Sequence, residues 1–300
     1  MSDDEREQWE VVARGLEETG EYRVIRRYHT VDHYTEPDSA PTQLGLIVDT
    51  ETTGIDGQKD KVIELGLVLF EYAPETGRIY RIVEKFDQLQ DPGRPIPSEI
   101  TALTHITDEM VHGQHIDEGA VQSLVARSSL IIAHNAAFDR PFVEQNWPAF
   151  QEKPWACTMS QIHWYDEGIA TQKQELIALS TGFFYDAHRA GNDCLALLHI
   201  LARVLPVSAV PALKPLLSHA MTDDAHIWAI GAPFETKDAL RMRGYRFNNG
   251  TNGRPKAWHR TVSADEKEEE LVFLESLYPS ARSTARIDVT SPLDRFSVRA

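Results

Sequence analysis

Hydrophobic residues recur along the chain in short runs that polar turns separate. Each run is long enough for one strand, and stretches with helical spacing alternate with the later runs. Strands that alternate with helices in one chain indicate an α/β layer architecture. The predicted strands are Leu44–Val48, Val62–Phe70, Ile79–Phe86, Leu130–Ala133 and Trp155–Ile162.

Both ends of the chain carry weaker patterns. Residues 3–19 predict an acidic amphipathic helix with Trp9, Val12 and Leu16 on one stripe, and a short strand at 22–28 follows it. Residues 35–41 are rich in turn formers, which is typical of a linker. We therefore expect an N-terminal extension of residues 1–40 before the main domain.

Asp49 and Glu51 end the first predicted strand. Side chains alternate between the faces of a strand, so these two carboxylates point the same way, roughly 7 Å apart along the backbone. This spacing suits a divalent cation between them. The alternative is the polar start of a turn, because Thr52-Thr53-Gly54 follows.

Two later segments favour the metal site. The strand Leu130–Ala133 breaks at His134-Asn135 and runs into a helical stretch that carries Asp139. His188 precedes Asp193 by five positions, where a loop enters an apolar-periodic helix predicted over Cys194–Val204. Each segment alone is also typical of a helix cap or an exposed turn. Their order along the chain indicates one shared cleft.

These segments resemble the three motifs of the DEDDh, or DnaQ-like, 3′-to-5′ exonucleases. The matching motifs are Asp-x-Glu at 49–51, His-Asn-x-x-Phe-Asp at 134–139 and His-x4-Asp at 188–193. The resemblance spans residues 41–206 and implies a ribonuclease H-like fold, a five-stranded mixed sheet flanked by helices. The segment Ile100–Thr107 is similar to the family's substrate-gripping segment, with His105 where relatives usually carry Gly.

The resemblance implies the chemistry of five residues. Carboxylates suit hard cations, and two such ions about 3.5–4 Å apart clamp the attacking and leaving oxygens of a phosphodiester. We therefore expect two divalent cations, Mg²⁺ or Mn²⁺. A mobile imidazole suits a general base on the attacking water, although a surface His that caps the last helix is the alternative. The expected metal ligands are Asp49, Glu51, Asp139 and Asp193, and the expected base is His188.

Single-stranded DNA or RNA 3′ ends are the expected substrate, cleaved to nucleoside monophosphates. In relatives, positions equivalent to Thr52, Thr53 and Ile106 contact the last nucleotide, so Ile106 is expected to wedge against the terminal base. Phe138 is expected to support the pocket, and His134 and Asn135 are further substrate-binding candidates. Turn hydroxyls and core apolar residues are the alternative interpretation. No residue type here indicates a contact to the 2′-hydroxyl that separates RNA from DNA.

Composition adds expectations about location. The chain has 300 residues, 42% of them hydrophobic, which suffices for one sizeable core and a small appendage. We expect a cytoplasmic protein, because no segment has a membrane-spanning length and the first residues lack a signal pattern. The two cysteines, Cys157 and Cys194, predict buried small hydrophobes rather than a disulfide framework or a zinc site.

The net charge of −16 argues against broad binding to nucleic acid. Residues 237–260, however, contain seven basic residues and one acidic residue, interleaved with aromatic residues. A surface for unpaired bases and a small domain's core with a solvated basic rim are equal alternatives. The candidates for the nucleic-acid surface are Arg243, Arg246, Lys256 and Arg260, with Tyr245, Phe247 and Trp258 as stacking rings.

The C-terminal part resembles a small module that is appended to some bacterial DEDDh exonucleases. In it a short helix leads through Gly244-Tyr245-Arg246 into a strand, and Trp258 and a helix at 265–277 would complete it. We expect a small basic α+β domain over residues 207–280 and a flexible tail over residues 281–300, with a strand over residues 286–290 as the alternative for part of that tail.

Two other functions fit the same motifs. The chain could be the proofreading subunit of a DNA polymerase, docked through its C-terminal module, or the partner of another DNA repair protein. It could also be a catalytically silent nucleic-acid-binding module. Four carboxylates and His188 argue against silence, because clustered anions repel phosphate and serve no purpose in a binding role.

Overall fold

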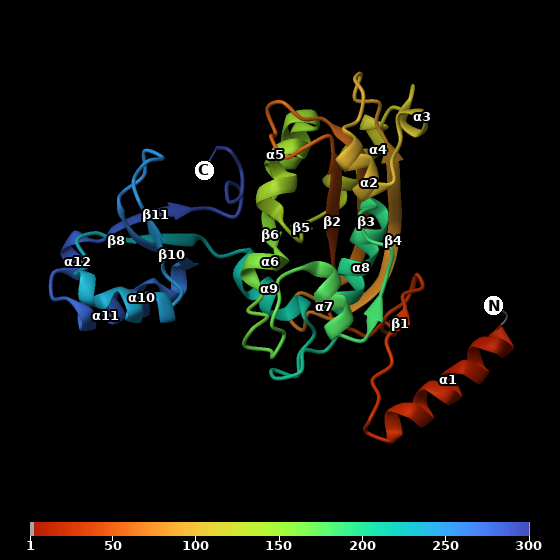
Figure 1. Cartoon of the computed structure of the whole chain (residues 1–300), viewed down its shortest axis with the longest axis horizontal. Helices are drawn as coiled ribbons and strands as arrows, with labels where there is room; N and C mark the ends of the chain where they lie inside the picture. The colour runs from red at the N-terminus through yellow and green to blue at the C-terminus, as the bar shows by residue number, and fades with distance from the viewer. Residues whose placement is uncertain (1–2, 300) are drawn as a thin grey trace.

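The computed structural model describes residues 3–299 and contains a larger and a smaller domain (Figure 1). The larger domain is built on a five-stranded sheet of order β4-β3-β2-β5-β6. Strands β2, β3 and β4 are antiparallel, whereas β5 and β6 run parallel to β2. The bounds are β2 Gln43–Thr52, β3 Val62–Tyr72, β4 Ile79–Leu89, β5 Leu130–Ala133 and β6 Trp155–Cys157.

The predicted mixed sheet is therefore confirmed, with one strand shorter than expected. The run Trp155–Ile162 was predicted as a single strand, but the chain leaves the sheet after Cys157 and forms the short helix α6 over Thr158–Gln161. Ile162 and Trp164 still pack into the core from the turn that follows. An apolar run thus marked burial correctly but not the end of the strand.

Helices cover both faces of this sheet. Ile47 of β2 packs with helix α8, Ala190–Ala202, whereas Leu46 and Val48 pack on the opposite face with α4 and α5. Because both faces are covered, β3 is an almost continuous apolar run rather than an alternating one. The remaining elements of this domain are α2 Ser98–Thr104, α3 Asp108–Val111, α4 Glu118–Arg127, α5 Ala136–Asn146, η1 Pro148–Glu152, α7 Gln174–Ser180, β7 Phe183–Phe184 and α9 Leu213–Ala220.

The N-terminal extension begins with helix α1, Asp3–Glu18, which extends away from the sheet (Figure 1). The strand predicted at 22–28 is only β1, Arg26–Arg27, paired in parallel with β7. The Arg26 guanidinium bonds to Glu10 at 2.9 Å and to Glu17 at 3.0 Å, which holds the helix against the extension. The predicted apolar stripe of α1 stays uncovered, with Trp9 65% exposed.

The smaller domain is an antiparallel sheet of order β11-β8-β10-β9 with helices on one face. Its core packs Ile227, Leu240, Tyr245 and Leu274 between the sheet and the helices. The strands are β8 Asp224–Ala229, β9 Arg246–Asn248, β10 Ala257–Ser263 and β11 Arg286–Thr290. The helical elements are η2 Phe234–Thr236, α10 Lys237–Met242, η3 Ala264–Glu266, α11 Lys267–Leu277 and α12 Ala281–Thr284.

The prediction of a flexible tail over 281–300 is wrong for residues 281–299, whereas the alternative strand at residues 286–290 is present as β11. Helix α12 and strand β11 complete the smaller domain, and the chain then returns to the larger domain. The Trp155 N–H donates to the Pro292 carbonyl at 3.0 Å, and Phe296 packs against the core beside α5. Residues 1, 2 and 300, the outer ends of the predicted extension and tail, lie outside the described residues.

A buried arginine of α5 holds this returning segment. Arg140, 0% exposed, donates to the backbone carbonyls of Leu293 and Arg295 and to the Glu144 carboxylate at 2.7 Å. Its guanidinium also lies 5.2 Å from the centroid of the Trp155 ring. A planar cation with several fixed donors suits such a set of acceptors. Residues 291–299, which we name the C-terminal clasp, thereby connect the smaller domain to the helix that carries Asp139.

Within residues 3–299, no helix combines the length and the apolar composition needed to cross a membrane.

We predict that Arg140→Leu destabilises the protein by about 3–5 kcal/mol, because it removes the buried cation that is paired with the Glu144 carboxylate and donates to two backbone carbonyls. Urea unfolding would measure the loss. The matched control is Arg299→Gln, since Arg299 also bonds to Glu144, at 3.0 Å, but is 40% exposed. We expect the control to cost less than about 1 kcal/mol. Equal stability of the two variants would contradict the role of the clasp.

Candidate active site

Asp49 and Glu51 point to the face of β2 that α8 covers, as their alternation predicts. Gly66 of β3 stands opposite Asp49, and a Cβ at Gly66 would lie 2.4 Å from the Ala190 backbone. The missing side chain therefore lets the first turn of α8, which carries Asp193, rest directly on the sheet. Carboxylate oxygens of Asp49, Glu51 and Asp193 consequently lie within 4.8 Å of one another.

Asp139 approaches the cluster from the opposite side of β2. Strand β5 ends beside Val48, so the next backbone N–H of β2 has no strand partner on that edge. The N–H and the hydroxyl of Thr50 donate instead to the Asp139 carboxylate, at 3.1 and 2.8 Å. These bonds fix the orientation of a side chain that is buried in the first turns of α5. The structure thus brings all four predicted carboxylates together.

Burial and mutual repulsion dominate the electrostatics of the cluster. Burial raises the pKa of Asp49 well above its usual range, and the charges of Asp139, Asp193 and Glu51 raise it further. Burial, followed by the charges of Asp193 and Glu64, raises the pKa of Glu51 to about 8. The pKa values of Asp139 and Asp193 are also raised, mainly by burial. A set of buried carboxylate oxygens with this proton affinity fits a divalent cation, which neutralises the anions without protons.

Three polar groups orient Asp193. The Tyr185 hydroxyl donates to its carboxylate at 2.7 Å, the Gln174 amide at 3.2 Å and the Arg189 N–H at 3.2 Å. Sequence reasoning did not find Tyr185 or Gln174. Both lie within 20 residues of Asp193, but neither belongs to a periodic pattern or a motif, so only the folded geometry identifies them.

A buried ion pair beside the cluster was also missed. Glu64 stands opposite Glu51 across β2 and β3 and is fully buried. The Arg189 guanidinium donates to it at 2.8 Å and the Ala190 N–H at 2.7 Å. Burial and the Glu64 charge raise the pKa of the neighbouring Asp87 to about 6. An acid inside an apolar strand was the available signal, because a buried carboxylate requires a partner.

His188 lies at the exposed side of the site. Its ring is 44% exposed, and Nε2 is 3.0 Å from the Glu175 carboxylate of α7. Its backbone adopts the left-handed conformation, φ 62°, immediately before α8. His188 therefore stands close to Asp193, as predicted, but its ring is engaged with an acid outside the predicted set.

The predicted base wedge is wrong. Ile106 is 0% exposed and packs with Ile63, Ile96 and Val111, so its side chain cannot contact a base. Two apolar side chains that sequence reasoning missed are exposed instead. Ile55, in the loop directly after the β2 carboxylates, is 88% exposed, and Leu103 of α2 is 48% exposed.

The two predicted substrate hydroxyls are used within the loop. Thr52 donates to the Gly54 carbonyl at 2.6 Å. Thr53 donates to Asp60 at 3.2 Å and accepts from Arg94 at 2.6 Å and from the Lys61 N–H at 3.0 Å. Both hydroxyls therefore shape the loop after β2, and their role as substrate contacts stays a prediction.

His134 is a structural residue rather than the predicted substrate contact. Its two ring nitrogens bond to the Thr158 hydroxyl at 2.8 Å and the Gln172 carbonyl at 2.7 Å. Burial lowers its pKa to about 4, so the ring is neutral at pH 7. Asn135 is exposed at the N-terminus of α5, and Phe138 packs on Phe142 with ring centroids 5.2 Å apart. These two residues remain available at the edge of the site.

The four predicted basic residues do not share one surface. Arg243 bonds to Glu269 at 2.8 Å and to Glu270 at 3.2 Å, and Arg260 bonds to Glu270 at 3.0 Å. These pairs hold α11 beneath the sheet. Arg246 and Lys256 are exposed. Of the predicted stacking rings, Tyr245 lies in the core, and Phe247 packs edge-on against Trp258.

His105 keeps the backbone that Gly usually provides. It ends α2 in the left-handed conformation, φ 58° and ψ 14°, and its N–H donates to the Thr101 carbonyl. We predict that His105→Gly stabilises the protein by about 1 kcal/mol, since Gly adopts this conformation without a Cβ penalty. Thermal unfolding would test this. His112, which ends α3 at φ −55°, is the matched control, and Gly there should not stabilise. A loss of stability in His105→Gly would contradict the argument.

We predict that divalent cation binding releases about one proton or more at pH 7, because a carboxyl with a pKa of about 8 must lose its proton to bind metal. Protons and cation compete, so metal affinity falls as the pH falls below about 8. Calorimetric titration in two buffers of different ionisation enthalpy would count the protons. Glu51→Gln should release fewer, and a binding heat that does not depend on the buffer would contradict the assignment.

Comparisons with known proteins place the larger domain in a family. The family model RNase T, described as an exonuclease, matches residues 46–201. Over 162 residues the chain is 33% identical to a DNA polymerase III PolC-type of Clostridium perfringens, covering 52% of this chain and 11% of the relative. It is 28% identical over 166 residues to the DNA polymerase III subunit epsilon of Treponema pallidum, covering 52% and 74% of the two chains.

The chain thus spans about a tenth of its PolC-type relative. Among solved structures, Exonuclease I of E. coli in complex with a 5cy-dA13 oligonucleotide is similar, with a TM-score of 0.52 and 13% identity over 81% of this chain and 71% of the other. At this identity the likeness shows a common fold alone. The resemblance of the smaller domain to an appended bacterial module stays a prediction. Because the family model covers more than half of the residues, the chain belongs to the RNase T exonuclease family, and its resemblance to the DnaQ-like 3′-to-5′ exonucleases is confirmed.

Proposed function

We propose that the protein is a metal-dependent 3′-to-5′ exonuclease that acts on single-stranded nucleic acid and releases nucleoside monophosphates. The observation that carries this proposal is the convergence of Asp49, Glu51 and Asp193, with Asp139 beside them and His188 at the exposed edge. Membership of the exonuclease family supports it.

Two cations, Mg²⁺ or Mn²⁺, are the proposed cofactors, and they would supply an activated water and stabilise charge on the phosphoryl oxygens. Asp49, Glu51 and Asp193 would hold them from the α8 side of the sheet. Thr50 keeps one Asp139 oxygen occupied, which leaves the other oxygen free for the cluster. Asp193 is held by Tyr185 and Gln174, so the ligands are oriented before substrate arrives.

His188 is the proposed general base. Its ring is accessible to solvent and now bonds to Glu175, so it would accept the proton of the attacking water after leaving that partner. Arg189 and Ala190 are fixed to Glu64, which holds the backbone on one side of His188 while its ring remains free to turn. A mobile imidazole on a fixed backbone suits a group that must accept a proton and then release it.

Single-stranded ends are the proposed substrate, because Ile55, four residues after Glu51, and Leu103 of α2 expose apolar surface that the faces of unpaired bases could cover. Asn135 offers a polar contact at the N-terminus of α5, where the helix dipole favours a phosphate. The oligonucleotide in complex with the similar E. coli Exonuclease I supports DNA as the first substrate to test.

A polymerase partner is a second part of the proposal, supported by the PolC-type and epsilon relatives. The exposed apolar stripe of α1 is the surface available for such a partner, because the helix extends away from the sheet (Figure 1). One measurement distinguishes a proofreading subunit from a free-standing enzyme. The cleavage rate of the isolated protein should rise on addition of a replicative polymerase only if the protein is a proofreading subunit.

We predict that the protein shortens 3′-labelled single strands with Mg²⁺ or Mn²⁺ and stops in a chelator. Asp49→Ala should lose most of the rate yet fold, since it removes one of several repelling anions. His188→Ala should slow cleavage by about 10²- to 10⁴-fold with the same metal requirement. DNA and RNA strands run side by side would identify the preferred sugar.

Glu175→Gln is the matched control for His188→Ala, since it removes the partner of the ring and keeps the imidazole. We expect this variant to retain most of the activity. Full-speed cleavage in chelator would refute the metal assignment. An unchanged rate in His188→Ala would assign His188 a structural role instead.

A further inference from the structure

The smaller domain leaves one face of its sheet without a helix. Cross-strand pairs share a face, so the register places Arg286 and Trp228, Trp228 and His259, and His259 and Arg246 on the same side. Ile227 and Val262 belong to the other side, where they pack against the helices. In Figure 1 these helices lie beneath the sheet. The opposite face of the sheet points upward in this view, toward the β9–β10 loop and the C-terminal clasp. We name this helix-free side the open face.

Three rings occupy the centre of the open face. Trp228 is buried, and its indole N–H donates to Asp288 at 2.9 Å. The rings of His226 and His259 lie on it, with centroids 4.6 and 4.7 Å from the Trp228 ring. They are also stacked on each other at 5.0 Å, and both are partly exposed. Flat rings that neighbours hold in place are suited to stacking with unpaired bases.

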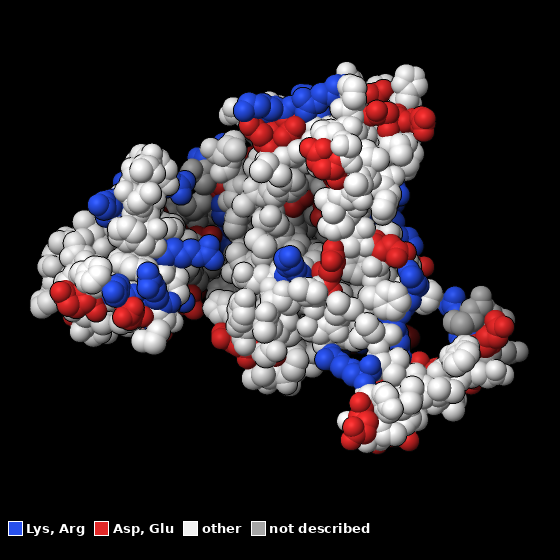
Figure 2. Space-filling model, in the orientation of Figure 1, with Lys and Arg blue, Asp and Glu red and all other residues white. Residues whose placement is uncertain are grey.

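Cations border these rings. Within residues 3–299, no ion pair involves Arg246 or Arg254, and both side chains are exposed. Their charges, together with burial, lower the pKa of His259, which places both cations near that ring. Basic side chains of the smaller domain are visible in Figure 2, some of them where it approaches the larger domain. Arg243 and Arg260, by contrast, are neutralised on the helix side.

The open face borders a groove between the domains. The groove has a volume of about 660 Å³, and its lining includes His226, Arg254 and Arg286 from the smaller domain. Phe296 of the clasp and Ala137 of α5 line it from the other side. Its volume falls within the range of about 300–1,000 Å³ that is usual for ligand sites. Ala137 is two residues from Asp139, so the groove reaches the helix that carries a catalytic carboxylate.

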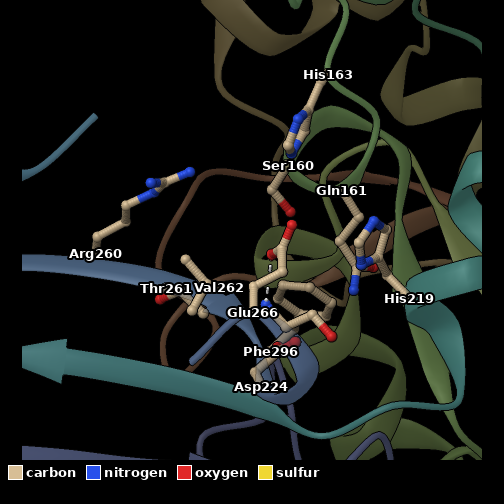
Figure 3. Close-up of a pocket in the computed structure, with 11 residues that line it drawn as sticks. Ser160, Gln161, His163, His219, Asp224, Arg260, Thr261, Val262, Glu266 and Phe296 are labelled. Atoms are coloured by element: carbon tan, nitrogen blue, oxygen red, sulfur yellow. Dashed lines mark hydrogen bonds between the residues drawn. The ribbon is translucent and has the colours of Figure 1, made fainter. Parts of the chain in front are cut away.

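A second hollow at the domain boundary has different chemistry (Figure 3). Its volume is about 190 Å³, and its lining includes the carboxylates of Asp224 and Glu266. Figure 3 shows the Glu266 side chain pointing toward Ser160 of α6, and its carboxylate accepts from the Ser263 N–H at 3.1 Å. Asp224 and Asp288 also line the larger groove. There, however, Arg295 lies 3.6 Å from Asp224 and Arg286 lies 2.8 Å from Asp288. The exposed Arg254 adds a further positive charge. The larger groove is therefore the better candidate for nucleic acid.

We propose that the groove and the open face beside it bind the single strand behind its 3′ end. Arg254 and His226 line the groove itself, and Arg246 and His259 continue the surface on the open face. The two arginines would contact phosphates and the two histidine rings would stack with bases. This inference rests on the proposed exonuclease function. It explains how a chain with a net charge of −16 retains a polyanionic substrate, since local charge decides the contact. Burial lowers the pKa of His226 to about 4, so its ring stacks as a neutral group at pH 7.

The test compares two double variants that each remove two positive charges from the smaller domain. Arg246→Gln with Arg254→Gln changes the open face. Lys237→Gln with Arg241→Gln changes α10, on the opposite side of the sheet. A long 5′-labelled single strand is titrated with full-length protein in chelator, and fluorescence anisotropy reports binding over a salt series. Thermal unfolding checks that both variants are folded.

We predict that the open-face variant binds about 10-fold or more weakly at physiological salt, and that its slope of log affinity against log salt falls by about 1.4, since each phosphate contact contributes about 0.7. The α10 variant should bind as the parent does. Equal binding by both variants would overturn the proposal and assign the groove to a protein partner. Failure of the exonuclease proposal would be distinct, because the parent would then cleave no strand with metal whatever its binding in chelator.

Discussion

Repulsion among four clustered, partly buried carboxylates is the constraint on which the larger domain depends. The cluster holds like charges at short distances, so each ionised carboxylate raises the free energy of the others, and burial raises it further. Its members are Asp49, Glu51, Asp139 and Asp193. The surrounding residues oppose this repulsion at specific points. Gly66 lets α8 approach, and Thr50 donates two hydrogen bonds to Asp139. These contacts keep the anions in place until a cation removes the cost.

Neutralisation of the neighbouring Glu64 by Arg189 belongs to the same balance. Without this pair, a fully buried fifth carboxylate would stand opposite Glu51 and raise the charge of the cluster. The pair also fixes the backbone at Ala190, where α8 begins. One ion pair therefore limits the repulsion and sets the position of Asp193. Breaking a buried pair of this kind is costly because the remaining charge stays buried.

Helix α5 links this site to the smaller domain. Asp139 and Arg140 are consecutive, and they point to different partners, the first to Thr50 and the second to the C-terminal clasp. Any movement of the clasp therefore acts on the helix next to Asp139, a proposed metal ligand. The clasp is buried because its backbone carbonyls, at Leu293 and Arg295, accept hydrogen bonds from Arg140. Without these acceptors a buried guanidinium would be strongly destabilising.

The sequence predicted those features that periodicity and motif spacing encode. The strands of the larger domain and the convergence of Asp49, Glu51, Asp139 and Asp193 were expected, because alternation and strand ends decide them locally. The hydrogen bonds of Thr53 and His134 within the fold were not predicted, because their partners lie elsewhere in the chain. These partners are Asp60, Arg94, Thr158 and Gln172. Ile106 shows the same limit, because whether an apolar side chain is a wedge or part of the core depends on which elements cover it. The clasp was missed because its residues lack periodicity and are held by contacts to distant residues, including Arg140, Glu144 and Trp155.

The distribution of charge resolves the apparent conflict between a net charge of −16 and a polyanionic substrate. Helix α1 contains seven acidic and two basic residues, so about a third of the net negative charge lies on an element that extends away from the sheet (Figure 1). At physiological ionic strength, charges farther apart than about 8 Å are largely screened from one another. The carboxylates of the site are the anions closest to the substrate, and bound cations would reverse their effect. Under the proposed function, the acidity of the whole chain would limit non-specific binding along a nucleic acid. The proposed metal site and the exposed Arg246 and Arg254 would still attract the strand, which would favour recognition of an end over coating of a strand.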